Sequence, residues 1–547
     1  MIWIRPREPE LILVGGKVLT MDDRVPEAEG VAVKDGLILA VGSEAEIRGL
    51  AGPDTRIVEI GAGRVLVPGF NESHSHLFTM GRSRSRVQLW HCRSIGEIQA
   101  EIEKAVREAE PGEWIWGIGW AEAALEEQRE PTRHDLDPVS PRNPVIISRI
   151  YNTDCVNTLA LKLAGIDRDT PNPPGGLIVR DPDTGEPNGL LKENAKDLVR
   201  NCVPEPPVEQ QAQWIEAAMA DYVRYGITSV MDPGVTPAQL SAYHHLYKHK
   251  GFRVRVSAQP DFRDRHFPLR HERLEHLGVM WGFGDEWFSL GPAKISLDGG
   301  LANMTSYLSM PYRKPGGRTV LRMAVEELDD IVFAFHRRGW SVGAHATGDL
   351  AHELMVRAMA RAVERQPRSD VRHHLVHGYF PSERVLEIMR DYDIVYDLQP
   401  AFIYYQGDAY EAVVGRKWAD RFKPLRQILD AGVKVCINSD VPTSSTYNPM
   451  IGIYSAVTRK TRKGDTLGAD QAIGVREAIK AYTLGGAYKT MEEDRKGSIV
   501  PGKFADLALL AEDPERVDPE RLKDIRVEMT ITGGRIVYDA RAEGDGR

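Results

Sequence analysis

The sequence is poor in cysteine. Its 547 residues include only Cys92, Cys155, Cys202 and Cys436, which lie far apart and form no CxxC pair. This excludes a disulfide framework and gives no sign of a zinc site built from thiolates. We therefore expect a cytoplasmic location.

The chain also lacks an excess of positive charge and a long apolar segment near its start. Seventy Lys and Arg residues against 79 Asp and Glu residues give a net charge of −9. No basic run with interleaved aromatic residues occurs, so we expect no nucleic-acid partner. The N-terminal stretch MIWIRPREPELILVGG is interrupted by charged residues and a proline. It predicts neither a signal peptide nor a membrane span, and we expect no membrane partner.

The two ends of the chain share one pattern. Short apolar runs separated by Gly and Asp turns, such as ELILVGGKVLTMD near the start and VEMTITGGRIVYD near the end, are typical of antiparallel strands. The length of the chain predicts two to four domains. We therefore predict a small composite β-sandwich domain formed by residues 1–66 and 495–547, in which the C-terminal strands complete a sheet begun by the N-terminal ones.

The middle of the chain alternates apolar strand-like runs with helical segments. There are eight such runs, of which VLVPGF is the first and VKVCINSD is the last. Alternating strands and helices predict parallel strands with right-handed crossovers, so the fold class is α/β, with a (β/α)8 TIM-type barrel over residues 67–494. The long stretch after the first strand exceeds any ordinary loop. It predicts a large insertion at about residues 82–205, over the mouth of the barrel.

Histidines and other polar residues follow several of the predicted strands. His74 and His76 in NESHSHLF are one residue apart, so on an extended segment they point the same way. An HxH pair alone is weak support for a metal site, because polar loop histidines are the simpler alternative. The later strands add further candidates at the same end of the barrel, namely Lys294, His345, His377 and Asp440.

Two of these assignments have plain alternatives, and one histidine has close neighbours. Lys294 could be a buried lysine paired with Asp298, and Asp440 could cap the loop that follows it. His373 and His374 lie beside His377, and strand alternation cannot put all three on one face. At least one of the three is therefore expected to be a packed or surface histidine.

The motifs together resemble a known family. PGFNESHSH, AKISLDGGLANMTSYLSMPY, HATGDLA, LQPAF, SDVP and GSIVPGKFADLALLAEDP extend over nearly the whole chain. They are similar to the amidohydrolase superfamily, in its branch of metal-dependent hydrolases related to N-substituted formamide deformylase. The resemblance implies a mononuclear or binuclear metal site with the following ligands: His74, His76 and Asp440 on one ion, His345 and His377 on the other, and a carboxylated Lys294 between them.

The implied activity is hydrolysis of a non-peptide C–N bond in a small amide, formamide, carbamate or cyclic amide, by attack of metal-bound hydroxide. Imidazole and carboxylate ligands suit one or two Zn²⁺ ions, with Mn, Fe or Co as alternatives. Asp440 is expected to move the proton of the attacking water, while His345 or His377 helps to hold the oxyanion. Two other hypotheses remain: the same site acting on an ester, lactone or phosphoester, and a catalytically silent binding homologue. The family resemblance also raises a homodimer as an expectation.

The insertion carries candidates for contact with a small-molecule substrate. They are Trp120, Arg149 and Asn152, with packing inside the insertion as the alternative for Trp120. The chain also departs from its relatives, which often carry Asp where this chain has Glu72 and a histidine where it has Asn152. Substrate recognition by a histidine at position 152 is therefore in doubt.

Overall fold

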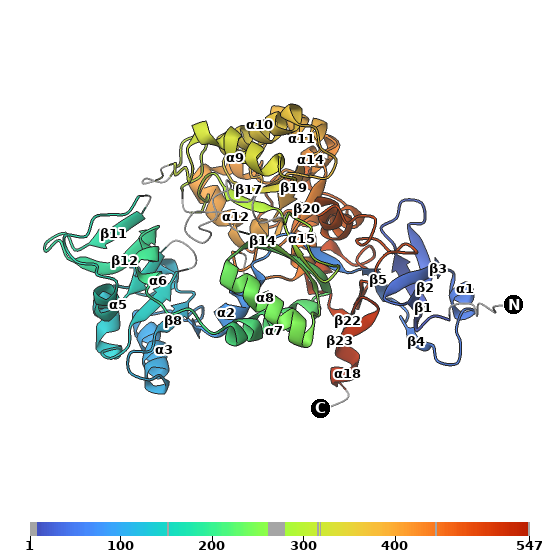
Figure 1. Cartoon of the computed structure of the whole chain (residues 1–547), viewed down its shortest axis with the longest axis horizontal. Helices are drawn as coiled ribbons and strands as arrows, with labels where there is room; N and C mark the ends of the chain where they lie inside the picture. The colour runs from blue at the N-terminus through green and yellow to red at the C-terminus, as the bar shows by residue number, and fades with distance from the viewer. Residues whose placement is uncertain are drawn as a thin grey trace. The chain divides into compact units, whose positions relative to one another are not determined.

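The computed structural model describes residues 8–149, 153–174, 176–260, 279–302, 304–313, 317, 319–443 and 446–544. The chain forms two compact units, shown in Figure 1. One unit combines Met1–Leu77 with Glu216–Arg547, and the other is Phe78–Ile215. The second unit extends a few residues beyond the predicted insertion at both ends.

Both ends of the chain contribute to one eight-stranded sheet. Its order is β23-β22-β21-β5-β1-β2-β3, with β4 paired to β1. Its strands are β1 (Leu11–Leu19), β2 (Glu27–Lys34), β3 (Leu37–Gly42), β4 (Arg56–Glu59), β5 (Val65–Pro68), β21 (Leu507–Leu510), β22 (Val527–Thr532) and β23 (Arg535–Asp539). The ends of the chain meet where β21 runs antiparallel to β5, with Leu509 opposite Leu66. Both leucines are buried in the core of this sheet.

Turn chemistry explains two hairpins of this sheet. Asp35 and Gly36 connect β2 to β3, and both have positive φ, 52° and 76°. Gly533 and Gly534 connect β22 to β23 with φ of 55° and 72°. Two-residue hairpin loops in which both residues have positive φ favour Asp-Gly and Gly-Gly, so the local sequence determines where these strands turn.

Seven of the eight strand-like runs in the middle of the chain form strands of two parallel sheets, as predicted. The first run, VLVPGF, is divided, because Val65–Pro68 forms β5 of the composite sheet and only Phe70 belongs to a strand of the parallel sheets. A ninth strand, Phe288–Leu290, was not predicted as a strand of its own. β6 (Phe70–Glu72), β13 (Ile227–Val235), β14 (Arg255–Pro260) and the short β15 (Phe288–Leu290) form one parallel sheet. β16 (Ala293–Ser296), β17 (Val342–Ala346), β18 (His374–His377), β19 (Val395–Leu398) and β20 (Val435–Ile437) form another. Within the described ranges no ladder joins β15 to β16 or β20 to β6, so the strands pair as two sheets and not as one closed ring.

Backbone hydrogen bonds still connect the segments that follow β6 and β20. The His76 N–H donates to Val441 O at 2.9 Å, and the Asp440 N–H donates to His74 O at 3.0 Å. These two bonds place the segment after the first barrel strand beside the segment after the last.

Helices separate these strands along the chain. The main ones are α7 (Val208–Val223), α8 (Pro237–Lys250), α9 (Val325–His336), α10 (Asp349–Arg365), α11 (Glu383–Asp391), α12 (Ala401–Val414), α14 (Leu425–Asp430), α15 (Pro449–Thr458), α16 (Val475–Lys480) and α17 (Gly486–Lys489). The alternation of strand and helix confirms the predicted α/β class. None of the helices formed by the described residues is long and apolar enough to cross a membrane.

The composite sheet and the two parallel sheets belong to the same compact unit. Arg255 in β14 pairs with Asp506 just before β21 at 2.8 Å, and both side chains are buried. The Gly69 N–H also donates to Asp506 O at 2.8 Å. Breaking a buried ion pair of this kind is costly, so it holds β14 and the segment before β21 together. The composite sheet and the parallel sheets therefore belong to one compact unit, although they lie far apart in the sequence.

The second unit, Phe78–Ile215, has a sheet of its own. The order is β11-β12-β10-β9-β8-β7. Its strands are β7 (Val87–Gln88), β8 (Ile115–Ile118), β9 (Val145–Ser148), β10 (Thr153–Val156), β11 (Gly176–Arg180) and β12 (Pro187–Glu193). Helix α3 (Ile95–Glu108) begins at the N-cap Ser94 and buries Ile98 and Ile102 in the core of this unit. The unit therefore has a hydrophobic core independent of the parallel sheets.

Candidate metal centre

The predicted metal ligands lie on the parallel strands or directly after them. His74 and His76 follow β6, Lys294 lies in β16, His345 in β17 and His377 ends β18, while Asp440 follows β20. The carboxyl ends of parallel strands meet at one edge, which is where α/β barrels carry their chemistry. The structure therefore gathers residues that are up to 366 positions apart in the chain.

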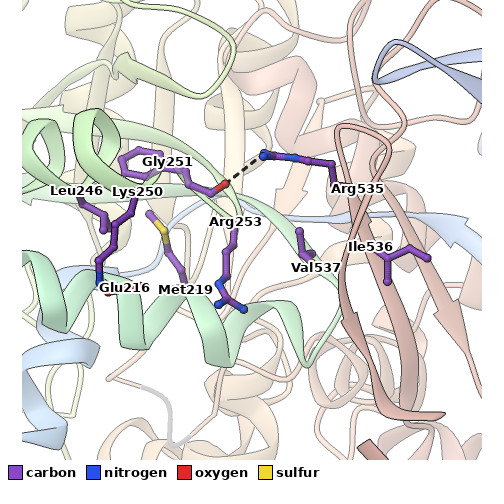
Figure 2. Close-up of a pocket in the computed structure, with 10 residues that line it drawn as sticks. Glu216, Met219, Leu246, Lys250, Gly251, Arg253, Arg535, Ile536 and Val537 are labelled. Atoms are coloured by element: carbon purple, nitrogen blue, oxygen red, sulfur yellow. Dashed lines mark hydrogen bonds and ion pairs between the residues drawn. The ribbon is translucent and has the colours of Figure 1, made fainter. Parts of the chain in front are cut away.

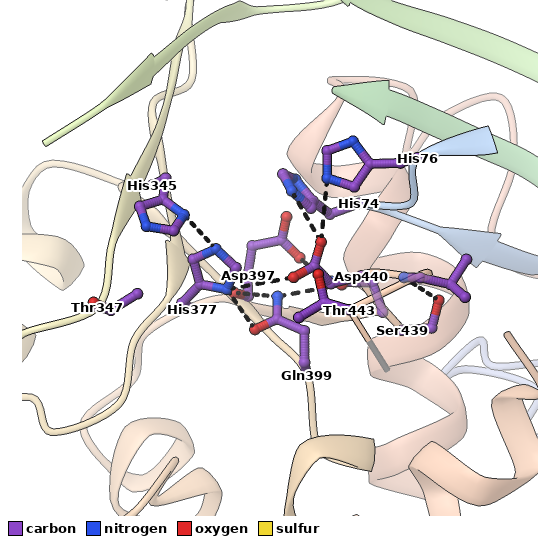
Figure 3. A network of polar contacts seen from close by, with 12 residues as sticks. His74, His76, His345, Thr347, His377, Asp397, Gln399, Ser439, Asp440 and Thr443 are labelled. Carbon is purple, nitrogen blue, oxygen red and sulfur yellow. Dashed lines mark hydrogen bonds and ion pairs between the residues drawn. The ribbon is translucent and has the colours of Figure 1, made fainter. Parts of the chain in front are cut away.

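Three of these residues form a compact group. One ligand atom from each of His74, His76 and Asp440 lies within 4.8 Å of the others. Figure 3 shows the carboxylate of Asp440 facing both imidazoles, with Oδ1 3.4 Å from Nε2 of His76 and 3.7 Å from Nε2 of His74. His74 and Asp440 are buried and His76 is half-buried. Two imidazoles and a carboxylate at this separation are a donor set that suits a divalent cation.

His345 and His377 form a second pair. His377 Nε2 lies 2.7 Å from His345 Nδ1 (Figure 3). The other nitrogen of His345, Nε2, lies 2.9 Å from the carbonyl oxygen of Gly299, and a carbonyl can only accept. A neutral His345 therefore carries its hydrogen on Nε2 and directs the lone pair of Nδ1 towards His377. The two nitrogens lie close enough to share either a proton or a cation.

Burial keeps two of these imidazoles neutral. Desolvation, followed by the charge of Lys294, lowers the pKa of His74 well below its usual value of 6.5. Desolvation, followed by the neighbouring His345, lowers the pKa of His377 in the same way. Neutral imidazole is the form that binds metal, so the electrostatics of the site fit the predicted ligand roles.

Lys294 lies beside the histidine pair of the first strand. Its Nζ is 3.5 Å from His74 Nε2. Asp298, the alternative partner considered for this lysine, is occupied by the loops above β16 and β17. It accepts hydrogen bonds from the N–H groups of Tyr307, Thr347 and Gly348, each at 2.9 Å. The role of Lys294 among the metal ligands stays a prediction.

Two of the predicted ligands adopt unusual backbone conformations. His377 has φ of 90° and Asp440 has φ of 51°. Positive φ is rare for residues other than glycine and costs about 1–3 kcal/mol for a strained residue, so it persists where the surroundings over-determine it, often at functional sites. The segment around Asp440 is held from the side of β6, since Glu72 accepts a hydrogen bond from the Ser439 N–H. Burial raises the pKa of Glu72 to about 8.

Sequence reasoning missed a polar network beside the predicted ligands. Asp397 in β19 pairs with Lys489 at 2.6 Å, and both side chains are fully buried. Gln399, directly after β19, contacts His377 and the buried Lys423. Gln399 could have been predicted as a site residue because it follows the end of a strand. Lys423 and Lys489 lie outside the strands, so no sequence pattern indicated them.

The histidines beside His377 are packed. His373 lies 3.0 Å from His336, and both are buried. His374 is also fully buried. Both neighbours of His377 therefore match the packing alternative. Cys436 is buried as well, and its thiol lies 3.1 Å from Asp397 Oδ1.

Of the residues predicted to contact substrate, two lie in the second unit and one lies outside the described residues. Trp120 is 1% exposed, lies in the hydrophobic core of that unit, and donates its indole N–H to Ile147 O at 3.1 Å. This favours the packing alternative. Arg149 pairs with Glu122 at 2.8 Å, and its contact with substrate stays a prediction. Asn152 lies outside the described residues.

A cavity of about 330 Å³ lies elsewhere in the first unit, between α7, α8 and β23 (Figure 2). Met219 and Leu246 contribute apolar surface to it, and Arg253 and Arg535 contribute charge. None of the predicted metal ligands lines this cavity. We therefore do not place the substrate there.

Comparisons with known proteins agree with the resemblance seen in the motifs. The model of the amidohydrolase family matches residues 62–538. The putative amidohydrolase YtcJ of Bacillus subtilis is 32% identical over 538 residues, covering 96% of this chain and 98% of that protein. The N-substituted formamide deformylase of Arthrobacter pascens is 29% identical over 561 residues, covering 97% and 98%.

A solved structure has the same fold. An uncharacterized metal-dependent hydrolase from Pyrococcus horikoshii aligns over 93% of this chain and 99% of its own, with a TM-score of 0.76 and 24% identity. This structure shows the fold. The family match and the two relatives confirm the resemblance and the class of enzyme, a metal-dependent hydrolase of non-peptide C–N bonds.

Proposed function

Because the chain belongs to the amidohydrolase family, we propose that it hydrolyses a small amide, formamide, carbamate or cyclic amide. The observation that carries the proposal is the convergence of His74, His76 and Asp440 within 4.8 Å, beside the pair of His345 and His377. The deformylase among its relatives makes N-substituted formamides the first substrates to test. We further propose that the two parallel sheets act as the two parts of a (β/α)8-type barrel around this centre.

The donor set supports one or two divalent ions, with Zn²⁺ as the first choice. His74, His76 and Asp440 would hold one ion, and His345 and His377 would hold another. Such an ion lowers the pKa of a coordinated water to about 7 and polarises a substrate carbonyl. An ammonium on Lys294 would oppose cation binding 3.5 Å from His74. A carbamate formed from this lysine and CO₂ would instead supply anionic oxygens, so we propose that Lys294 is carboxylated.

The side chains of the site then have distinct roles. Asp440 accepts the proton of the attacking water and passes it to the leaving nitrogen, because its carboxylate is buried between the imidazoles of both groups. His345 or His377 would help to hold the developing oxyanion through the ion that the pair would bind.

A substrate panel tests the proposal. Purified protein loaded with Zn²⁺ should hydrolyse N-substituted formamides, carbamates or cyclic amides faster than esters and lactones of matched shape. His76→Ala should lower both bound metal and turnover, whereas His91→Ala, which alters an exposed histidine of the second unit, should change neither. Hydrolysis of the esters alone, or a His76→Ala variant with full metal content and normal turnover, would contradict the proposal.

A further inference from the structure

His377 contacts a buried hydrogen-bond chain on the side away from His345. Its Nδ1 lies 3.1 Å from Gln399 Oε1, and the same oxygen accepts a hydrogen bond from Lys423 Nζ at 2.7 Å. Lys423 and Gln399 are both fully buried. The chain therefore runs from Lys423 through one amide oxygen to one ring nitrogen of a predicted ligand.

Two independent contacts fix the orientation of the Gln399 amide. On one side, Lys423 Nζ donates to it, and Nζ carries hydrogens whether the group is an ammonium or an amine. On the other side, the amide nitrogen lies 3.2 Å from Asn438 Oδ1, which accepts. Asn438 is itself oriented, because its Nδ2 donates to Asp397 Oδ1. The oxygen of Gln399, and not its nitrogen, therefore faces His377.

The orientation of this amide determines the tautomer of His377. Since an amide oxygen can only accept, His377 Nδ1 must carry the ring hydrogen. With the ring hydrogen on Nδ1, the neutral ring carries its lone pair on Nε2. That lone pair points to His345 Nδ1 at 2.7 Å, where the predicted ion would be held.

The lysine at the start of this chain is rigidly placed. Lys423 Nζ also donates to the backbone carbonyl of His377 at 2.7 Å, so it holds both the main chain and, through Gln399, the ring of the same residue. The rings of Tyr379, Phe402 and Phe422 surround Nζ at 4.6–5.4 Å. The backbone is held as well, because the Lys423 N–H donates to Tyr379 O at 2.9 Å.

We propose that Lys423 and Gln399 are positioning residues that hold His377 as its Nδ1–H tautomer and so make Nε2 the ligand atom. Partners of this kind orient a metal-binding histidine and increase its basicity. The inference rests on the proposed metal centre. Its test does not rest on turnover, because the tautomer can be read in metal-free protein.

The experiment combines two readouts on four variants, and a fifth variant serves to assign the NMR signal. Side-chain ¹⁵N NMR of histidine-labelled, metal-free protein reports the tautomer, with the His377 signal assigned by its loss in His377→Asn. Competition with a chelator reports the affinity for Zn²⁺. Lys423→Met removes the donor and Gln399→Leu removes the acceptor, whereas Gln399→Glu retains an acceptor for both neighbours. Lys496→Met is the matched control, because it removes another buried lysine whose Nζ pairs with Glu492 at 2.7 Å.

We expect the Nδ1–H tautomer in the wild type, in Gln399→Glu and in Lys496→Met. In Lys423→Met and Gln399→Leu, the Nε2–H tautomer should appear and the affinity for Zn²⁺ should fall by about 10–100-fold. If Lys423→Met does not fold, Gln399→Leu decides the matter alone. The proposal is wrong if the wild type holds the Nε2–H tautomer, or if both variants keep the wild-type tautomer and affinity. A wild type with the Nδ1–H tautomer that binds no divalent metal would instead refute the proposed function.

Discussion

Replacing Asp440 by asparagine separates proton transfer from ligand geometry. Asparagine tolerates positive φ as aspartate does, so the backbone at φ of 51° can be retained. The bond from the Asp440 N–H to His74 O is also retained, since it uses only main-chain atoms. The amide oxygen can still face His74 and His76, at 3.7 and 3.4 Å in the wild type. It cannot accept and release a proton as the carboxylate does.

The expected effect is therefore on the chemical step. General acid–base groups contribute about 10²–10⁴-fold to rate, so kcat of Asp440→Asn should fall by that factor, equivalent to about 2.7–5.5 kcal/mol in the activation free energy. The substrate KM should change little, because binding contacts are retained.

The assay measures steady-state kinetics and metal content on the same preparation. Asp440→Ala serves as the variant that loses the ligand oxygen, and its metal content should fall. Asp393→Asn is the matched control, because Asp393 also has positive φ, 50°, but contacts Arg372 and Tyr488. It should leave kcat unchanged. If Asp440→Asn keeps its metal and more than about a tenth of wild-type kcat, less than the smallest expected loss, Asp440 does not transfer the proton.

Three further predictions concern stability. Lys489→Met should lower the free energy of unfolding by about 3–5 kcal/mol in urea titrations, because it leaves Asp397 buried without its cation; a loss below about 1 kcal/mol would contradict this. Burial lowers the pKa of His373 to about 3, so below pH 6.5 the unfolded state binds more protons. Stability should fall by up to about 1.4 kcal/mol per pH unit towards pH 3 for this group, and a flat profile between pH 7 and 5 would refute the reasoning. Truncation at Gly497 removes β21, which pairs with β5, so the shortened chain should aggregate or melt at a lower temperature in thermal scans. Unchanged melting would show that the pairing adds no stability.

The strands were predictable because their signal is local. Each barrel run is a short block of apolar, often β-branched residues that ends at a polar residue, and such a block reads as a buried strand without knowledge of its neighbours. The two hairpin loops were equally local, since Asp35-Gly36 and Gly533-Gly534 have the positive φ that their turns require. Grouping strands into sheets was not predictable in the same way. The pairing of β15 with β14, and the separation of β15 from β16, depend on contacts between distant segments.

The same distinction applies to the candidate site. His74, His76 and Asp440 were found because each follows a strand, and parallel strands bring their carboxyl ends to one edge. Gln399 follows β19 in the same way and could have been included on that rule. Lys423 could not have been included on that rule, because it lies in a loop 46 positions after His377. Its Nζ donates a hydrogen bond to His377 O from a position among three aromatic rings, and this packing is not visible in the sequence.

The backbone conformation of His377 shows why contacts such as those of Gln399 and Lys423 could not be predicted from the sequence. A histidine with φ of 90° has no local preference for that conformation. The carbonyl of His377 accepts a hydrogen bond from Lys423, and its ring contacts Gln399 and His345. Each of these contacts comes from another part of the chain. Strain of about 1–3 kcal/mol persists only where several such contacts oppose its release. The backbone conformation of His377 therefore depends on tertiary structure, whereas its place among the predicted ligands follows from its position at the end of a strand.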